Sequence, residues 1–329
     1  MTSGLPFDDY RDLLRRLPQP DAKARREAEG RLRLLEAQGV GLGRMGELAV
    51  WLAGWQGRSE PQIARPMVTI FAGTHGITRH DISTSGQDET QAMVEFCAAG
   101  GAAINQICAA NDFGLKVFDL ALHMPVADIS QGPAFDERGC AVTMAFGMEA
   151  IAGGADLICV GSLGVGGETV AAALLMALHG KAALDWIKPE GDADMTERRI
   201  RLIDQAVALH GGHVQDPLDA LRRLGGREIA AISGAILAAR MERIPVVLDG
   251  IVSLAAAAVL HTVREDALDH CVLGHLTANR GQRNAAAALG LKPLVDLDIG
   301  EGEGVGAAMG ALVLKNAAQV HASMTIRQN

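Results

Sequence analysis

A glycine-rich loop near the end of the chain carries two carboxylates where a helix is expected to begin. Residues 300–306 read Gly-Glu-Gly-Glu-Gly-Val-Gly. Glycines let backbone N–H groups approach a ligand, and a helix start adds about half a positive charge. Glu301 and Glu303 would repel a phosphate, so the loop is predicted to hold an ionised carboxylate that accepts a proton from a ligand. Glu303 is the stronger candidate, because glycines flank it. Alternatively, both acids merely complement the helix dipole, which is worth about 0.3–1 kcal/mol each.

A second glycine-rich loop, residues 161–169, precedes another expected helix. Its glycines at 161, 164 and 166 do not have the spacing of dinucleotide-binding loops, and no Walker lysine follows them. The loop can still offer backbone N–H groups to a phosphate at the start of that helix. A tight strand-to-helix turn that binds nothing is the alternative.

Further polar residues follow apolar runs that are expected to form strands. His75 and His275 each come directly after such a run, and Asp249 and Gly250 follow another. Because the carboxyl ends of parallel strands meet at one edge of a sheet, we expect these loops to converge on a single ligand site. For each histidine, contact with a substrate and a purely structural role both remain open.

The segment from His210 to His213 invites a comparison with metal sites, but no cysteine or carboxylate cluster near it completes a ligand set. We therefore expect a solvated loop there and no metal. The sequence also lacks the Gly-x-Ser-x-Gly turn of hydrolases, which disfavours nucleophilic hydrolysis. No bound cofactor is expected.

Six short apolar runs alternate with helix-length, alanine-rich stretches, and this order indicates a parallel sheet covered by helices on both faces. The runs are 67–72, 115–120, 157–161, 244–248, 271–273 and 294–297. Three helices without a strand are expected before Pro61–Pro66, and a final helix from about Val305 to Ser323 is expected to return to them. We predict a small helical domain, residues 1–65 joined by about 308–329, and an α/β domain, residues 66–307.

Bulk composition narrows the class of protein. The chain has 329 residues, a formal net charge of −9 and no basic run, which argues against nucleic acid and anionic membranes as partners. Its alanine-rich run 254–260 is far shorter than the ~20 residues that span a bilayer. Five scattered cysteines without a Cys-x-x-Cys pair fit free thiols in a reducing compartment. A cytoplasmic protein is expected.

Five motifs, taken in order, resemble the nicotinate-nucleotide–dimethylbenzimidazole phosphoribosyltransferases of cobalamin biosynthesis. They span about 200 residues, so their order is far more specific than any one of them. The motifs are Gly100–Asn105, Ala145–Ala150, Gly225–Glu228, Pro245–Gly250 and Gly302–Ala308.

This resemblance implies a Rossmann-like α/β domain with a small helical domain, a homodimer, and a defined reaction. Phosphoribose passes from nicotinate mononucleotide to 5,6-dimethylbenzimidazole, which gives α-ribazole 5′-phosphate and nicotinate. The family's general base, a glutamate, falls on Glu303. The resemblance also implies contacts with the nucleotide phosphate from Ser162, Gly164, Gly166, Thr169 and Arg199, where relatives tend to have a lysine. The implied pocket residues are His75, Ser85, Asp249, Gly250, His275, Gly302 and Gly304.

Several loops depart from the family's usual motifs, among them residues 37–43, 161–169 and 277–279. Glu168 in particular would oppose the phosphate unless Arg199 or backbone donors compensate. Two functions therefore stay open: a working phosphoribosyltransferase, or a non-catalytic or regulatory paralogue that binds a benzimidazole-like or nucleotide ligand. The preferred base and the roles of Glu301 and Glu168 are left undecided.

Overall fold

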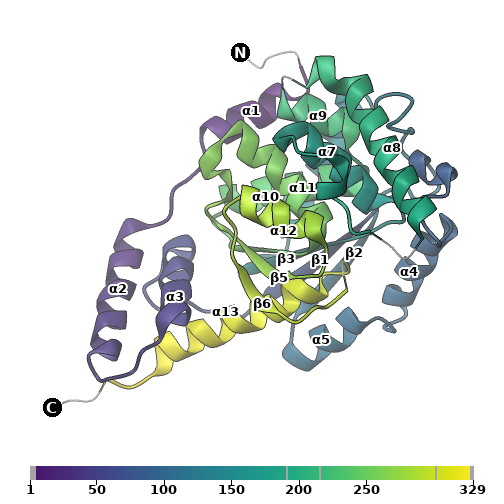
Figure 1. Cartoon of the computed structure of the whole chain (residues 1–329). Coiled ribbons are helices and arrows are strands. Elements are labelled where there is room, and N and C mark those ends of the chain that lie inside the picture. Colours follow the sequence, from purple (N-terminus) through teal and green to yellow (C-terminus); the bar gives the residue numbers. More distant parts are fainter. Residues whose placement is uncertain (1–4, 190–191, 215, 301, 327–329) are drawn as a thin grey trace.

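A computed structural model describes residues 5–189, 192–214, 216–300 and 302–326. Its centre is one six-stranded sheet in which every neighbouring pair of strands is parallel (Figure 1). The strands are β1 (Pro66–Ala72), β2 (Gly114–Asp119), β3 (Leu157–Leu163), β4 (Val246–Leu248), β5 (Cys271–Leu276) and β6 (Pro293–Asp296). All six predicted runs form strands, and the α/β fold class is confirmed.

The strand order is β2-β1-β3-β4-β5-β6, so the chain reverses its direction across the sheet between β1 and β3. This is the doubly wound order of flavodoxin-like sheets, extended by one strand, and not the 3-2-1-4-5-6 order of dinucleotide-binding domains. Ligands in such sheets bind beyond the carboxyl ends of the strands at this reversal. The topology therefore predicts where a site should lie.

Helices cover both faces of the sheet because successive residues of the buried strands face opposite sides. In β3, Ile158 and Val160 pack in one apolar cluster, and Leu157 and Cys159 in the other. On the first side lie α1 (Asp8–Arg15), α6 (Glu137–Met148), α7 (Gly167–His179), α8 (Ala193–His210), α9 (Pro217–Leu224), α10 (Arg227–Met241), α11 (Gly250–Val263) and α12 (Arg280–Ala288). On the second lie α3 (Gly43–Gln56), α4 (Asp88–Ala98), α5 (Ala103–Asn111) and α13 (Val305–Ser323). Short 3-10 turns occupy Gly76–His80, Glu149–Ile151, Ala183–Asp185, Gly211–His213 and Glu265–Leu268.

The three N-terminal helices do not pack as one bundle. The helix α2 (Ala22–Glu36) packs on α3, and the far end of α13 joins them, where the His321 ring donates to Ala28 O at 3.0 Å. By contrast, α1 packs on the α/β body, and its Tyr10 hydroxyl donates to Ala141 O at 2.6 Å. In Figure 1, α2 and α3 stand to one side of the sheet with the end of α13. The division near residue 65 stays a prediction.

One stretch, Asp88–Asn111, is apolar and long enough by composition to cross a membrane. It is divided into α4 and α5, and between them Gly100 takes the left-handed φ of 80°. Such a stretch is weak support for a membrane span.

Candidate active site

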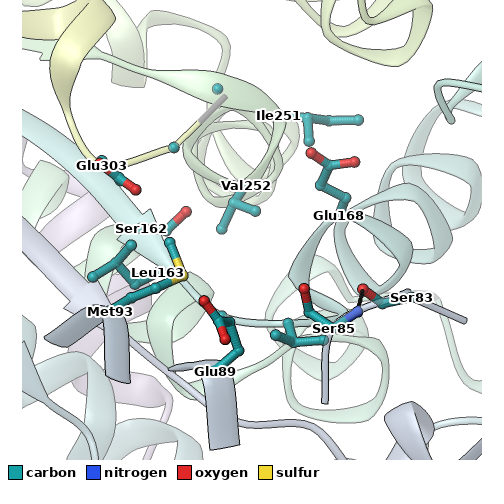
Figure 2. A pocket seen from close by; sticks show the side chains of 14 residues that line it. Ser83, Ser85, Glu89, Met93, Ser162, Leu163, Glu168, Ile251, Val252 and Glu303 are labelled. Carbon is teal, nitrogen blue, oxygen red and sulfur yellow. Dashed lines mark hydrogen bonds between the residues drawn. The ribbon is translucent and has the colours of Figure 1, made fainter. Parts of the chain in front are cut away.

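A pocket opens where the connections leaving β1, β3 and β4 meet the loop before α13 (Figure 2). This is the reversal point that the strand order singles out. The pocket brings together six of the predicted residues: Ser85, Ser162, Gly164, Gly250, Gly302 and Glu303. Three further lining residues, Leu163, Val165 and Glu168, belong to the 161–169 loop that was expected at a phosphate. The remaining lining residues were not predicted from the sequence: Ser83, Glu89, Met93, Ile251 and Val252.

Glu303 is held in an unusual backbone conformation on the pocket wall. Its φ is 54°, between 88° at Gly302 and 72° at Gly304. A non-glycine residue in the left-handed region costs free energy and persists only where its surroundings fix it. Here the Glu303 N–H donates to Ser162 O at 3.1 Å. A Cβ at Gly161 would collide with Gly304 N, so the loop lies directly across β3 because residue 161 lacks a side chain.

The environment of Glu303 favours its protonated form. Burial of the half-buried side chain raises the pKa of its carboxyl group, and the nearby charge of Asp249 raises it further. A carboxylate of raised pKa is a stronger base than an ordinary one. Glu301, the second acid of the loop, lies outside the described residues.

Asp249 and His275 lie below the pocket and not on its wall, because both side chains are fully buried. Their facing atoms, Oδ1 and Nδ1, are 3.1 Å apart. His275 was expected after a strand but lies within β5, where its ring Nε2 donates to Ile299 O at 3.1 Å. A histidine can lie inside the strand beyond Leu273 because its buried ring contacts Ile299 O and Asp249.

His75 is also buried beneath the pocket, opposite Glu228 at the start of α10. Nε2 of His75 is 2.9 Å from Oε1 of Glu228, and each side chain is 1% exposed. A Cβ at Gly167 would lie 3.5 Å from that Glu228 oxygen, which places the pair directly under the 164–167 loop. Glu228 belongs to the third motif of the sequence, but nothing in the residues around it indicated a histidine partner.

The residues that were expected to contact a phosphate lie around the start of α7, on β3, on the turn into the helix and on α8. Gly166 caps the helix with a φ of 87°. Thr169 and Arg199 are buried behind it, and Arg199 Nε donates to Thr169 Oγ1 at 3.0 Å. Arg199 Nη2 is also 3.6 Å from Oε2 of Glu168, whose side chain is 37% exposed and lines the pocket. The cation thus compensates the carboxylate that the sequence left in doubt.

The pocket wall contributed by α4 gave no sequence signal. Glu89 and Met93 lie one turn apart and face the pocket, as Figure 2 shows. Thr90 accepts a hydrogen bond from the N–H of Val165 at 3.1 Å, which ties this helix to the 161–169 loop. Glu89 is one of three carboxylates on the wall, with Glu168 and Glu303.

Within the part of the chain that the structure describes, no cluster of three histidine, cysteine or acidic side chains could hold a metal ion. The expectation of a solvated loop at 210–213 is wrong for His210. That ring is buried, because its Nε2 donates to Ile129 O at 3.0 Å.

Comparison with known proteins assigns the chain to a family. A family model described as "Phosphoribosyltransferase" matches residues 17–329. The nicotinate-nucleotide–dimethylbenzimidazole phosphoribosyltransferase of Brucella anthropi is 54% identical over 98% of this chain and 96% of its own length. The enzyme of the same name from Rhizobium etli is 55% identical over the same shares of the two chains.

A solved structure agrees with these sequence relatives. The nicotinate-nucleotide–dimethylbenzimidazole phosphoribosyltransferase of Thermus thermophilus superposes with a TM-score of 0.86 at 32% identity. The match covers 94% of this chain and all of that one. The chain therefore belongs to the nicotinate-nucleotide–dimethylbenzimidazole phosphoribosyltransferase family.

Proposed function

We propose that the protein transfers phosphoribose from nicotinate mononucleotide to 5,6-dimethylbenzimidazole, with Glu303 as the general base. The observation that carries this proposal is the half-buried carboxylate of Glu303 on the wall of the pocket at the sheet reversal, with its pKa raised. Family membership supplies the substrates, and the pocket supplies a base suited to this chemistry. The products are α-ribazole 5′-phosphate and nicotinate.

The proposed step needs one base and little acid. One ring nitrogen of the benzimidazole attacks C1′ of the ribose, and the C–N bond to the pyridinium breaks with its electron pair going to nicotinate. The proton on the other ring nitrogen passes to Glu303. General-base help of this kind contributes about 10²–10⁴-fold in rate. Holding the two rings in line on opposite faces of C1′ supplies the rest, and the configuration inverts.

The phosphate is proposed to lie at the start of α7. Backbone N–H groups of a helix start and its partial positive charge favour an anion there. Arg199 and Thr169 lie behind this turn, and Gly164 and Ser162 border the pocket beside it. His75, Asp249 and His275 support the loops from beneath, so their proposed contribution to substrate binding is indirect.

A direct assay tests the function. Purified protein is incubated with nicotinate mononucleotide and dimethylbenzimidazole, and nicotinate and α-ribazole 5′-phosphate are followed by chromatography. We expect stoichiometric formation of both, with kcat lowered about 10²–10⁴-fold in Glu303→Gln. Ligand binding without turnover would instead identify the non-catalytic alternative. The identity of 54–55% to relatives named as enzymes favours turnover.

A homodimer in the cytoplasm is proposed as the state in which the protein works. The edge strand β2 is only partly covered, and Phe146 of α6 packs edge-on against its Phe118 while remaining exposed. Val142 lies one turn earlier on α6 and is 61% exposed. Exposed apolar side chains gathered at a sheet edge are typical of a protein interface. The five buried free thiols fit a reducing compartment.

A further inference from the structure

We infer that Asp249 and His275 form a positioning pair that grips both ends of the loop bearing Glu303. This inference rests on the proposed role of Glu303 and adds two residues that set its place. Neither side chain reaches the pocket, so the pair acts through the loop and not on the substrate.

The contacts of the pair fall on the two ends of one loop. At the start, His275 Nε2 donates to Ile299 O at 3.1 Å. At the end, Asp249 Oδ2 accepts the N–H of Gly306 at 3.0 Å, in the first turn of α13. The two side chains meet between these anchors, with Nδ1 and Oδ1 3.1 Å apart. The two ends of this loop, at Ile299 and Gly306, are thus both held by a buried bridge that comes from β5 and the end of β4.

The backbone around the pair is shaped to admit it. A Cβ at Gly306 would collide with the His275 ring and meet Asp249, so this position requires glycine for steric reasons. A Cβ on Gly274 would lie 2.7 Å from Cα of Ala307, so α13 packs directly on β5 beside the pair. Three close approaches at one point indicate that the fold is fitted around the bridge.

We place a proton between the two halves of the bridge, because their facing atoms, Asp249 Oδ1 and His275 Nδ1, are buried and have no other hydrogen-bond partner among the described residues. A carbonyl oxygen can only accept a hydrogen bond, so the contact with Ile299 O requires a proton on Nε2 of His275. Nδ1 would then turn its lone pair toward Oδ1 of Asp249 unless a second proton lies between them. Burial lowers the pKa of His275, but the adjacent carboxylate outweighs this effect and raises it. Burial raises the pKa of Asp249 as well, against the opposing effect of His275. A raised pKa at either residue favours keeping the proton between Nδ1 of His275 and Oδ1 of Asp249.

The bridge lies beside a strained stretch of backbone, which it helps to hold in place. Three successive residues, Gly302 to Gly304, have positive φ, and Glu303 among them carries a steric cost. Strain of this kind persists only when neighbours over-determine the conformation. The bridge fixes the loop at both ends, and β3 fixes its middle through Ser162 O. Glu303 is consequently held at one place relative to the pocket.

The pair also affects the charge of Glu303. The charge of Asp249 contributes to the raised pKa of Glu303, after burial. Other titratable groups face Glu303 across the pocket: Glu89 of α4 and Glu168 of α7, with Cys97 of α4 packed nearby. Among these described groups, Asp249 is the one that combines an electrostatic effect with a contact to the loop itself.

Asp249→Asn tests the pair, because asparagine keeps the shape and an acceptor for the Gly306 N–H but removes the charge. We expect kcat to fall about 10²-fold, as for a catalytic group misplaced by about 1 Å, with KM for nicotinate mononucleotide nearly unchanged. The acid limb of the pH–kcat profile should move to lower pH, because one contribution that raises the pKa of Glu303 is gone. His275→Gln should lower kcat in the same way, and the double variant should be no worse than the poorer single one.

The matched control is Glu228→Gln, which removes another fully buried carboxylate paired with a histidine, below the same pocket but away from the 299–306 loop. It should leave the acid limb where it is. If Asp249→Asn and His275→Gln lower only the unfolding midpoint, with kcat and its pH profile unchanged, the pair is structural and the inference is overturned. If Asp249→Asn does not fold, His275→Gln alone decides. Should Glu303→Gln itself retain activity, the proposed base fails, which is a separate result.

Discussion

At the scale of single residues, the site depends on a carboxylate, Glu303, whose surroundings disfavour both its ionised form and its backbone conformation. Glu303 combines a left-handed backbone, partial burial and a neighbouring negative charge, and each of these opposes its ionised form or its conformation. Strained backbone and raised carboxyl pKa values both lower the stability of the folded state, and both are common at sites where a side chain has to accept a proton. The consequence can be measured without substrate.

Glu303→Gln should stabilise the protein at neutral pH. Because the folded pKa of Glu303 is raised above its unfolded value, folding favours the protonated form. That stability is fully present below the unfolded pKa and is lost as the pH rises through the folded pKa. Glutamine mimics the protonated form, so the melting temperature of the variant should exceed that of the wild type at pH 7–8. Near pH 4 the two should converge. Equal melting temperatures across this range would show that ionised Glu303 costs nothing.

Also at this scale, Glu168 is expected to weaken nucleotide binding. It lines the pocket beside the start of α7 and partly neutralises Arg199 at 3.6 Å. Glu168→Gln removes a repulsion toward the phosphate, so KM for nicotinate mononucleotide should fall, by up to about fivefold for a partly exposed pair worth about 1 kcal/mol or less. Glu89→Gln, which removes a carboxylate from the opposite wall, is the control and should change this KM less. A higher KM in Glu168→Gln would mean that the carboxylate binds the nucleotide.

At the scale of elements, the sequence predicted the strands well and their ends poorly. Fully buried parallel strands give unbroken apolar runs, which is why all six were found. The runs stopped at Gly161 and Leu273, whereas β3 and β5 continue to Leu163 and Leu276. Most of the added residues are polar or glycine, and their partners come from distant loops that no local pattern contains. Motif order placed Glu303 on the pocket, but the α4 wall and the two buried pairs depend on tertiary contacts.

Gly161→Ala should displace the loop bearing Glu303 more than it destabilises the sheet. Its Cβ would collide with Gly304 N in a closely packed contact, and overpacking of this kind costs about 1–3 kcal/mol. We expect kcat to fall about 10²-fold through the shift of Glu303. Gly30→Ala on α2 is the opposite case, because nothing lies within 4 Å of its Cβ, and it should stabilise by up to about 1 kcal/mol without affecting kcat. Kinetics together with urea unfolding separate the two effects, and full activity in Gly161→Ala would contradict the tight-loop account.

At the scale of the whole molecule, the reversal between β1 and β3 determines which connections can share a pocket. The chain from β1 crosses to β2 through α4 and α5 on one face, and the chain from β3 crosses to β4 on the other. Between them the carboxyl ends diverge and leave room for a ligand. The same arrangement leaves β2 as an edge strand beside α6, on the side away from α2 (Figure 1). The position of the pocket and the uncovered edge at β2 therefore both follow from the same strand order.

Val142→Glu should break the proposed homodimer if that edge is the interface. Val142 is 61% exposed, so a glutamate there is solvated in the monomer but would be buried without a partner between two copies. Light scattering after gel filtration should show the mass of two chains for the wild type and of one for the variant at micromolar concentration. Leu34→Glu on α2 changes a side chain of similar exposure far from β2 and should leave the mass at two chains. A dimeric Val142→Glu protein would exclude this edge as the interface, and a monomeric wild type would exclude the dimer itself.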